Sequence, residues 1–505
     1  MNKITRQKIN RRGFLRYGVP ALAITGGAVA LGFRGLRRYL ETSSDGFRVT
    51  SFGKIIPDPN GVIDLPVGFS YQAFSRTGEM MDDGLLVPGG HDGMAGFPGM
   101  TRDTVVLVRN HEIRAYKNGK PTKDIEKSGF GENNHLIRRI NSDYLYDSGS
   151  GDQPAIGGTT NLVYNTKTNK LEKHFMSLAG TNNNCAGGPT PWNTWITCEE
   201  DTSASDGDFA ADHGYNFEVP ARSISGLTKA TPLKAMGRFN HEAVAVDSRT
   251  GIVYQTEDRL DGLFYRFIPD QPSKLHKGGR LQALAIRDMP SANTCNWRLL
   301  DLNVFKAETW SWYNRLFKSR LEGIALGAMF DIRWIDIDEV ESPKDDLRKQ
   351  GLYKGAAVFA RGEGMFFDGQ TIFFVCTSGG PNRKGQVWCY IPSRYEGTAG
   401  EEKDPAKLEL FVEPNQSRIL DMGDNITMSP WGDLVICEDG SEDQHLVGIT
   451  PNGELYRFAR NAMPQKSELA GSTFSPDGTT LFVNIQSPGL TLAITGPWMS
   501  RSIVS

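Results

Sequence analysis

The residues best suited to chemistry are acids that recur at the ends of short apolar strands. "WITCEED" carries Glu199 and Glu200, "LVICEDG" carries Glu438, and "YQTED" carries Glu257. A carboxylate at the end of an apolar strand is costly unless solvent or a cation meets it. If several such acids converge, bound cations are the expected compensation, and oxygen ligands at flexible spacing favour Ca²⁺ over Zn²⁺.

A cysteine stands apart from these acids in the Asn- and Gly-rich string "NNNCAGGP". Cys185 offers a soft thiolate among hard carboxylates, which selects a transition metal at that position. Iron tolerates mixed sulfur and oxygen ligands, so the residues suggest a mixed iron and calcium cluster. The alternative is a buried free cysteine, which is our interpretation of Cys198, Cys376 and Cys437 near other strand ends.

Two histidines, His111 and His241, each precede a glutamate in the string "NHE". Adjacent strand residues point to opposite faces, so these histidines are expected to support the site from behind.

One phrase repeats along the chain: a small or acidic residue, a turn rich in Gly, Asp, Pro or Trp, and a β-branched strand that closes on polar residues. Copies begin at Asp92, Cys185, Asn240, Gly362, Asp424 and Gly471. Each copy indicates a hairpin, and repeated antiparallel units are typical of β-propeller blades. We therefore predict an all-β fold, a six-bladed β-propeller with long inter-blade insertions.

In a propeller, the innermost strand of every blade lines the axis, so equivalent positions converge there. The residues predicted to face the axis near the start of each repeat, called openers below, are Asp92, Cys185, Glu242, Glu363 and Asn425. Predicted closing positions are Glu112, Glu199, Glu200, Glu257 and Glu438. A sandwich of the same strands would scatter these acids as ordinary solvated charges. Glu322, in the insertion before the fourth copy, is either a further ligand or a plain strand residue.

The N-terminus has the pattern of a twin-arginine export signal, with Arg11 and Arg12 before Phe14 and Leu15. The apolar run that follows is short and interrupted by glycines, which suits a signal better than a membrane span. An uncleaved amphipathic anchor is the alternative. We predict a signal and linker over residues 1–40, a single propeller domain over 41–505, and a periplasmic or secreted protein exported by the twin-arginine machinery.

Composition narrows the function classes. The 505 residues carry a formal net charge of −3 and no basic stripe, which argues against nucleic-acid binding. The sequence has no "GxSxG" elbow, no Walker loop and no dinucleotide fingerprint, which weakens covalent serine hydrolysis and nucleotide-dependent chemistry.

Several strings together resemble PhoX-type alkaline phosphatases: "VPGGHDGMAGF", "NHE", "NNCAGGPTPWNTWITCEED", "NHEAVAVD", "YQTEDR", "ARGEGMFFDG" and "CTSGG". The resemblance runs from about Asp58 to Gln486. It implies a six-bladed propeller whose axial site holds iron (Fe³⁺) and calcium (Ca²⁺) and hydrolyses phosphate monoesters. Such enzymes are exported to scavenge phosphate.

The resemblance also assigns roles to individual residues. It implies that Cys185 binds iron with Glu200 as its partner acid, and that Glu257 and Glu363 are further metal ligands. Arg361 would bind phosphate, Glu363 would join it in catalysis, and Asn110 would bind substrate. Metal ligands expected from position in the repeat are Glu112, Glu199, Glu242, Asp424 and Glu438.

Two alternatives stay open at this point. The first is a calcium-dependent propeller hydrolase of the lactonase type, which would need neither Cys185 nor Arg361. The second is a non-catalytic periplasmic propeller in which metals only stabilise the blades. For the phosphatase we expect small phosphate esters as partners, and a monomer because a propeller leaves few free sheet edges.

Overall fold

The computed structural model describes residues 52–149, 153–205, 207–297, 323–414 and 419–498. The predicted signal over residues 1–40 and Glu322 lie outside the described residues. Among those described, no helix is long and apolar enough to span a membrane. All six cysteines are buried and free of disulfides, so Cys198, Cys376 and Cys437 are buried strand residues, as predicted.

Each of the six repeats folds as an antiparallel hairpin, which confirms the prediction from the repeated phrase. The hairpins are β4 (His91–Pro98) with β5 (Thr104–His111), β10 (Asn184–Pro189) with β11 (Thr194–Glu199), β13 (His241–Val246) with β14 (Val253–Glu257), β18 (Gly362–Phe367) with β19 (Ile372–Cys376), β22 (Gly423–Met428) with β23 (Leu434–Glu438), and β26 (Leu469–Phe474) with β27 (Thr480–Ile485).

Further strands extend these hairpins outward from the axis. They are β8 (Gly157–Asn165), β9 (Lys170–Thr181), β12 (Asn216–Pro220), β15 (Phe264–Pro269), β16 (Gly279–Ile286), β17 (Met329–Asp336), β20 (Gln386–Ile391), β21 (Lys407–Val412), β24 (His445–Ile449), β25 (Leu455–Asn461) and β28 (Leu490–Thr495). The N-terminal part adds β1 (Ile55–Ile56), β2 (Ile63–Pro66) and β3 (Ser70–Phe74), and a small hairpin comprises β6 (Tyr116–Lys117) and β7 (Lys120–Pro121).

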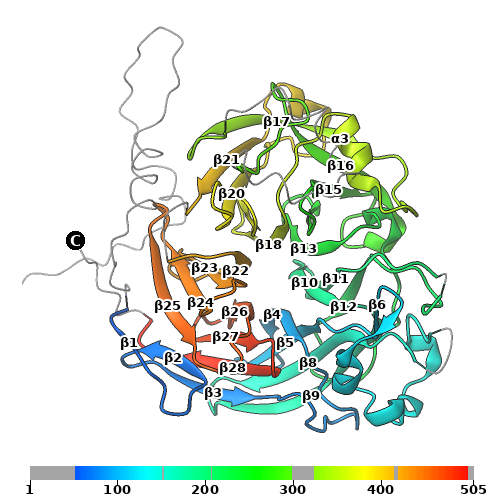
Figure 1. Cartoon of the computed structure of the whole chain (residues 1–505), viewed down its shortest axis with the longest axis vertical. Helices are drawn as coiled ribbons and strands as arrows, with labels where there is room; N and C mark the ends of the chain where they lie inside the picture. The colour runs from blue at the N-terminus through cyan, green and yellow to red at the C-terminus, as the bar shows by residue number, and fades with distance from the viewer. Residues whose placement is uncertain (1–51, 150–152, 206, 298–322, 415–418, 499–505) are drawn as a thin grey trace, which may run out of the picture.

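Helical structure is sparse and peripheral. The α-helix α3 (Leu347–Tyr353) lies at the edge of the ring in Figure 1. Short 3₁₀ helices are η2 (Lys123–Lys127), η3 (Glu132–Asn134), η4 (Ile137–Arg139), η5 (Ser142–Tyr144), η6 (Lys234–Met236), η7 (Leu275–Lys277) and η9 (Ala399–Glu402).

The strands form four separate blade sheets and one larger sheet around a common axis. The blades have the orders β4-β5-β8-β9, β10-β11-β12, β26-β27-β28-β3 and β22-β23-β24-β25, the last extended by β2 and β1. The larger sheet has nine strands, in the order β13-β14-β15-β16-β17-β21-β20-β19-β18. The all-β propeller is therefore confirmed.

The prediction of six separate blades is wrong for this larger sheet. Strand β17 pairs with β16 along one edge and with β21 along the other, so hydrogen bonding continues from β13 to β18. The insertions also differ from the prediction. The first lies within a sheet, between β5 and β8, and the second lies between β16 and β17.

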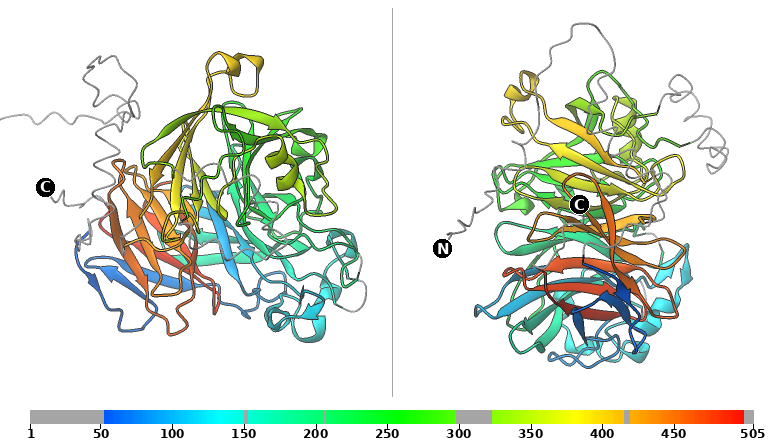
Figure 2. Two further views of the ribbon diagram at one scale, coloured as in Figure 1. Left: turned by 45° about the horizontal axis from the view of Figure 1, so that its top comes forward. Right: turned by 90° about the vertical axis from the view of Figure 1, so that its left-hand side faces the viewer.

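Despite the different sheet sizes, the innermost strands enclose the axis as a closed ring. Contacts run from β4 to β10, β13, β18, β22, β26 and back to β4 (Figure 1). The N-terminal strand β3 pairs with the C-terminal strand β28, which ties the two ends of the propeller together. Figure 2 shows the same sheets packed side by side about the axis. Equivalent positions of the first strands therefore meet at the centre.

The inner strands approach closely enough to require small residues. A register shift in each first strand forms a bulge near its start. In the bulge of β18, a Cβ added to Gly364 would lie 2.7 Å from the Cα of Asn425 on the neighbouring inner strand. In β4, a Cβ on Gly93 would lie 2.5 Å from the Cα of Ala186.

Gly364→Ala is expected to destabilise the protein by about 1–3 kcal/mol, because the new methyl group meets backbone that cannot rotate away. The measurement is the midpoint of urea unfolding. Gly207→Ala is the matched control, since a Cβ on Gly207 would meet no atom within 4 Å. Equal midpoints for the two variants would contradict this account of the packing.

Candidate metal centre

The bulges place one residue from each first strand at the axis. These residues directly follow the first paired residue of their strand and are Asp92, Cys185, Glu242, Glu363 and Asp424. All five are buried. In the sixth hairpin the equivalent residue is Gly471, which has no side chain to contribute. The predicted opener Asn425 is wrong by one residue: Asp424 occupies the position, and Asn425 Oδ1 accepts a hydrogen bond from the backbone N–H of Gly471 (2.6 Å).

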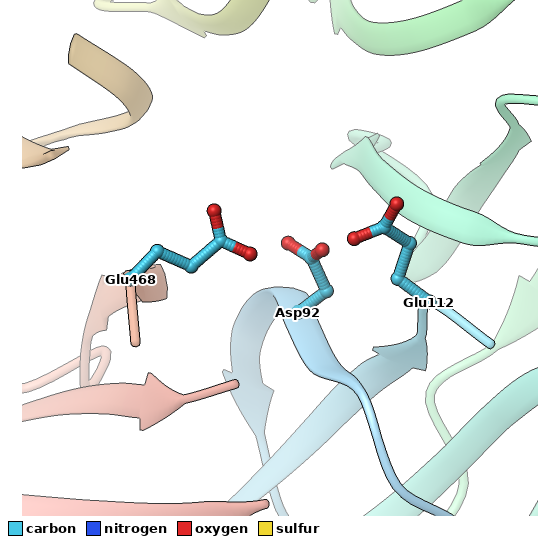
Figure 3. Close-up of side chains that lie close together, drawn as sticks. All are labelled: Asp92, Glu112 and Glu468. Atoms are coloured by element: carbon cyan, nitrogen blue, oxygen red, sulfur yellow. The ribbon is translucent and has the colours of Figure 1, made fainter. Parts of the chain in front are cut away.

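Six carboxylates gather there in two groups of three. In each group the ligand oxygens lie within 4.8 Å of one another; the groups are Asp92, Glu112 and Glu468, and Glu242, Glu363 and Asp424. Figure 3 shows the carboxylates of Asp92, Glu112 and Glu468 pointing toward one another from three separate segments. Sequence reasoning missed Glu468. Its only signal is that it stands three residues before Gly471, where the sixth repeat has a glycine in place of the axial acid or cysteine of the other five.

The electrostatics show that these acids cannot all be ionised in the protein alone. Burial, and then the charges of Glu112 and Asp424, raise the pKa of Asp92 well above its ordinary value. Burial, and then Glu363 and Asp424, do the same to the pKa of Glu242. The pKa of Asp424 rises to about 8 through burial and the neighbouring Asp439. Such a cluster needs protons or cations to offset its charge.

Three predicted ligands are directed away from these groups into bonds with other parts of the chain. Glu199 accepts hydrogen bonds from His213 Nδ1 (2.7 Å) and from the backbone N–H of Asn182 (2.9 Å) and Gly214 (2.9 Å). Its two oxygens are therefore engaged within the chain.

Glu257 and Glu438 are held in the same manner. Glu257 accepts from the Tyr265 hydroxyl (2.8 Å) and pairs with Arg348 (3.5 Å). Glu438 accepts from His445 Nδ1 (2.8 Å) and from the backbone N–H of Asp421 (2.7 Å). Like Glu199, each is the last residue of its strand.

The residues one position later face the acidic cluster instead. They are Glu112, Glu200, Asp258 and Asp439, and their charges raise the pKa values of the first-strand acids. Alternation along a strand explains the difference, because neighbouring residues point to opposite faces. Glu112 and Glu200 were predicted, whereas Asp258 and Asp439 were missed, although both stand directly after a predicted glutamate.

Cys185 lies in the bulge of β10, beside the acids. Its Sγ lies 3.3 Å from the carbonyl oxygen of His241, to which the thiol donates. Burial first, and then the charges of Glu242 and Glu200, raise the pKa of the Cys185 thiol well above its ordinary value. The sulfur belongs to neither group of three carboxylates.

Asn110, predicted to bind substrate, is fully buried and holds this bulge. Its Nδ2 donates to the carbonyl oxygens of Cys185 (3.1 Å) and Ala186 (2.6 Å), and its Oδ1 accepts from the Trp195 indole (2.8 Å). All its polar atoms are engaged, so the structure gives it a supporting position and no free group for substrate.

The two "NHE" histidines lie behind the acids, as predicted. His111 contacts the Gly89 carbonyl oxygen (2.9 Å) and Thr160 Oγ1 (3.0 Å), and His241 contacts the Gly237 carbonyl oxygen (3.0 Å). Burial lowers the pKa of His241 to about 3, so its imidazole is neutral.

Arg361 borders the cluster with its guanidinium partly exposed. Its Nε and Nη2 form a fork on Asp258 at 2.8 and 2.9 Å, and Nη2 lies 3.0 Å from Glu363 Oε1. Glu363 Oε1 nevertheless accepts no hydrogen bond. The backbone of Arg361 is left-handed, with φ of 55°, and is fixed by bonds to Arg259 and Thr377. Charge on Glu363 raises the pKa of Arg361, which therefore stays charged.

Comparison with known proteins identifies a family and a similar fold. The family model described as alkaline phosphatase PhoX matches residues 50–489. The structure of Pseudomonas fluorescens PhoX in complex with vanadate, a transition state analogue, is 17% identical, with a TM-score of 0.59 over 88% of this chain and 97% of that chain. A gluconolactonase from Xanthomonas campestris is 12% identical, with a TM-score of 0.37 over 89% and 99%. No curated protein matches the sequence.

Proposed function

The chain belongs to the PhoX family of alkaline phosphatases and is a metal-dependent phosphatase, and we propose that its active centre is the axial carboxylate cluster beside Arg361. The observation that carries the proposal is the pairing of buried, mutually repelling acids with a partly exposed arginine. Cations bound to the acids would create positive charge next to a guanidinium. That combination suits a phosphate monoester.

The residues fit bound cations. The acids outnumber the arginines that contact them, burial raises the pKa of Glu363 well above its ordinary value, and Glu363 Oε1 accepts no hydrogen bond. Their oxygens suit Ca²⁺, for which the candidate ligands are the two groups of three. Glu200 is the candidate partner acid for iron. Cys185 adds a thiol that suits iron. When bound, such ions polarise phosphoryl oxygens and lower the pKa of a bound water.

The chain's own residues position the substrate. Asp258 holds the Nε and Nη2 edge of Arg361, so the guanidinium is oriented before substrate arrives. Nη1 remains to donate to a phosphoryl oxygen, and the arginine keeps its charge at any working pH. Positioning and charge stabilisation are the main protein contributions to phosphoryl transfer.

The resemblance to PhoX-type alkaline phosphatases supports further features of the proposal. The protein would be a periplasmic or secreted monomer with one propeller domain over residues 41–505, exported by the twin-arginine route. Its substrates would be small phosphate monoesters, hydrolysed to scavenge phosphate.

Elemental analysis of protein exported through its own signal tests the metals, together with hydrolysis of a chromogenic phosphate monoester with and without added calcium. We expect iron and calcium together, and turnover that depends on calcium. Calcium without iron and without turnover would contradict the proposal and support a propeller in which metals only stabilise the blades.

Cys185→Ser is expected to remove most of the iron, because a hydroxyl is a poor substitute for a thiolate ligand. The readout is iron per protein chain by elemental analysis. Cys198→Ser is the matched control, since Cys198 is equally buried but lies inside β11. If Cys185→Ser keeps the iron content of the control, Cys185 is not an iron ligand.

A further inference from the structure

A second arginine, Arg114, borders the same cluster from the segment that follows β5. Its backbone is fixed on both sides. The carbonyl oxygen of Ile113 accepts from the N–H of Asn183 (3.1 Å), and the Thr122 hydroxyl donates to the carbonyl oxygen of Arg114. Ile113 itself is buried in an apolar cluster. The side chain of Arg114 therefore starts from a rigid point beside Glu112.

The guanidinium of Arg114 is tethered by one edge only. Its Nε donates to Asn183 Oδ1 (2.8 Å), and the amide of Asn183 in turn donates to Glu112 Oε1 (3.1 Å) and Glu200 Oε2 (3.0 Å). Asn183 is buried, so this tether is well defined. The cluster therefore orients the guanidinium through Nε alone.

The outer edge of this guanidinium is left available. Nη2 lies 3.9 Å from both Glu112 and Glu200, and Nη1 lies 3.6 Å from Asp201, distances too long for hydrogen bonds. Within the described parts of the chain, neither nitrogen donates a hydrogen bond. The side chain is 19% exposed, so a ligand can reach it. Two parallel donors at a fixed spacing match two oxygens of a phosphate.

Arg361 has fewer guanidinium nitrogens available to a ligand than Arg114. Asp258 already occupies its Nε and Nη2 edge, which leaves Nη1 as the nitrogen that no described residue engages. The two arginines flank one continuous arc of polar groups. Glu200 lies beside Arg114, and Asn240 Nδ2 links Glu200 Oε1 (2.8 Å) to the carbonyl oxygen of Asp258 (3.2 Å), the partner of Arg361.

We propose that Arg114 binds the transferable phosphoryl group, with Nη1 and Nη2 donating to two of its non-bridging oxygens while Arg361 donates to the third. The inference rests on the proposed function, since it assumes that the cluster is the phosphatase centre. It adds a binding residue for the dianionic phosphate monoesters that the proposed function already assigns. A monoanionic diester has only two non-bridging oxygens and cannot satisfy both arginines.

The experiment compares Arg114→Gln and Arg114→Lys with wild type in three measurements. These are the inhibition constant of inorganic phosphate, kcat/KM for p-nitrophenyl phosphate and bis-p-nitrophenyl phosphate, and metal content. We expect Arg114→Gln to raise the inhibition constant by about tenfold or more, which corresponds to the loss of charge-assisted hydrogen bonds. The ratio of monoester to diester kcat/KM should fall, and Arg114→Lys should recover part of both effects.

Arg394→Gln is the control, because Arg394 is a highly exposed arginine that pairs with Asp404 (2.8 Å). It should leave all three measurements unchanged. An unchanged phosphate inhibition constant in Arg114→Gln, with active wild type, would overturn the assignment. So would a loss of metal in step with activity, because Arg114 would then organise the ligands and not the substrate. Wild type that neither hydrolyses esters nor binds phosphate would overturn the proposed function itself.

Discussion

Arg361→Lys is expected to lower kcat/KM for a phosphate monoester by about 10²–10³-fold, the usual effect of removing one oriented donor at a developing charge. Lysine keeps the positive charge but cannot hold Asp258 through two nitrogens and still donate to a phosphoryl oxygen. The orientation of the donor is lost with the fork. Steady-state kinetics with p-nitrophenyl phosphate provide the measurement.

Two checks separate this effect from a general disturbance. Metal content should stay at the wild-type level, since Arg361 is not one of the proposed metal ligands. Arg394→Lys serves as the control, because it changes a highly exposed arginine that pairs with Asp404. Wild-type kinetics in Arg361→Lys would remove Arg361 from the mechanism.

Removal of the metals is expected to make stability strongly dependent on pH. Burial and like charges raise the pKa values of Asp92, Glu242 and Glu363 in the folded protein, and that of Asp424 reaches about 8. A carboxyl whose pKa is raised by folding binds its proton more tightly in the folded state. Stability therefore falls as pH rises above the unfolded values of about 4, until the folded pKa is passed.

The melting temperature of metal-free protein should fall by on the order of 10 °C between pH 5 and pH 8, because several groups contribute. The same titration of the metal-loaded protein should be much flatter, since bound cations replace the protons. Thermal melts after chelation and after calcium addition measure both. A metal-free protein whose melting temperature does not fall over this range would contradict the electrostatic description of the cluster.

A substitution with opposite effects in the two states sharpens this test. Glu242→Gln removes one repelling charge, so it should stabilise metal-free protein at pH 8 and destabilise the metal-loaded form. Glu132→Gln, at an exposed position, is the control and should change neither melting temperature. Destabilisation of both states by Glu242→Gln would show that Glu242 acts mainly through packing.

The sequence by itself determined the local units of this protein. The alternation of apolar residues and the turn residues within each copy set the six hairpins, because a hairpin needs only neighbouring residues. Repetition then identified Asp92, Cys185, Glu242 and Glu363 as equivalent positions that converge on an axis. The strings around Cys185 and Arg361 were specific enough to identify the family before any contact was known.

Tertiary structure alone decided which neighbouring acid faces the axis and which distant groups join it. Neighbouring strand residues point to opposite faces, so the point at which β14 ends decides which of two adjacent acids faces the axis. Here Asp258 faces the cluster and Glu257 bonds to other parts of the chain. Glu468 and Arg114 reach the cluster from segments outside the repeat, and β17 fuses two groups of strands through a long insertion. These outcomes depend on closure of the ring, which brings together residues that no local pattern relates.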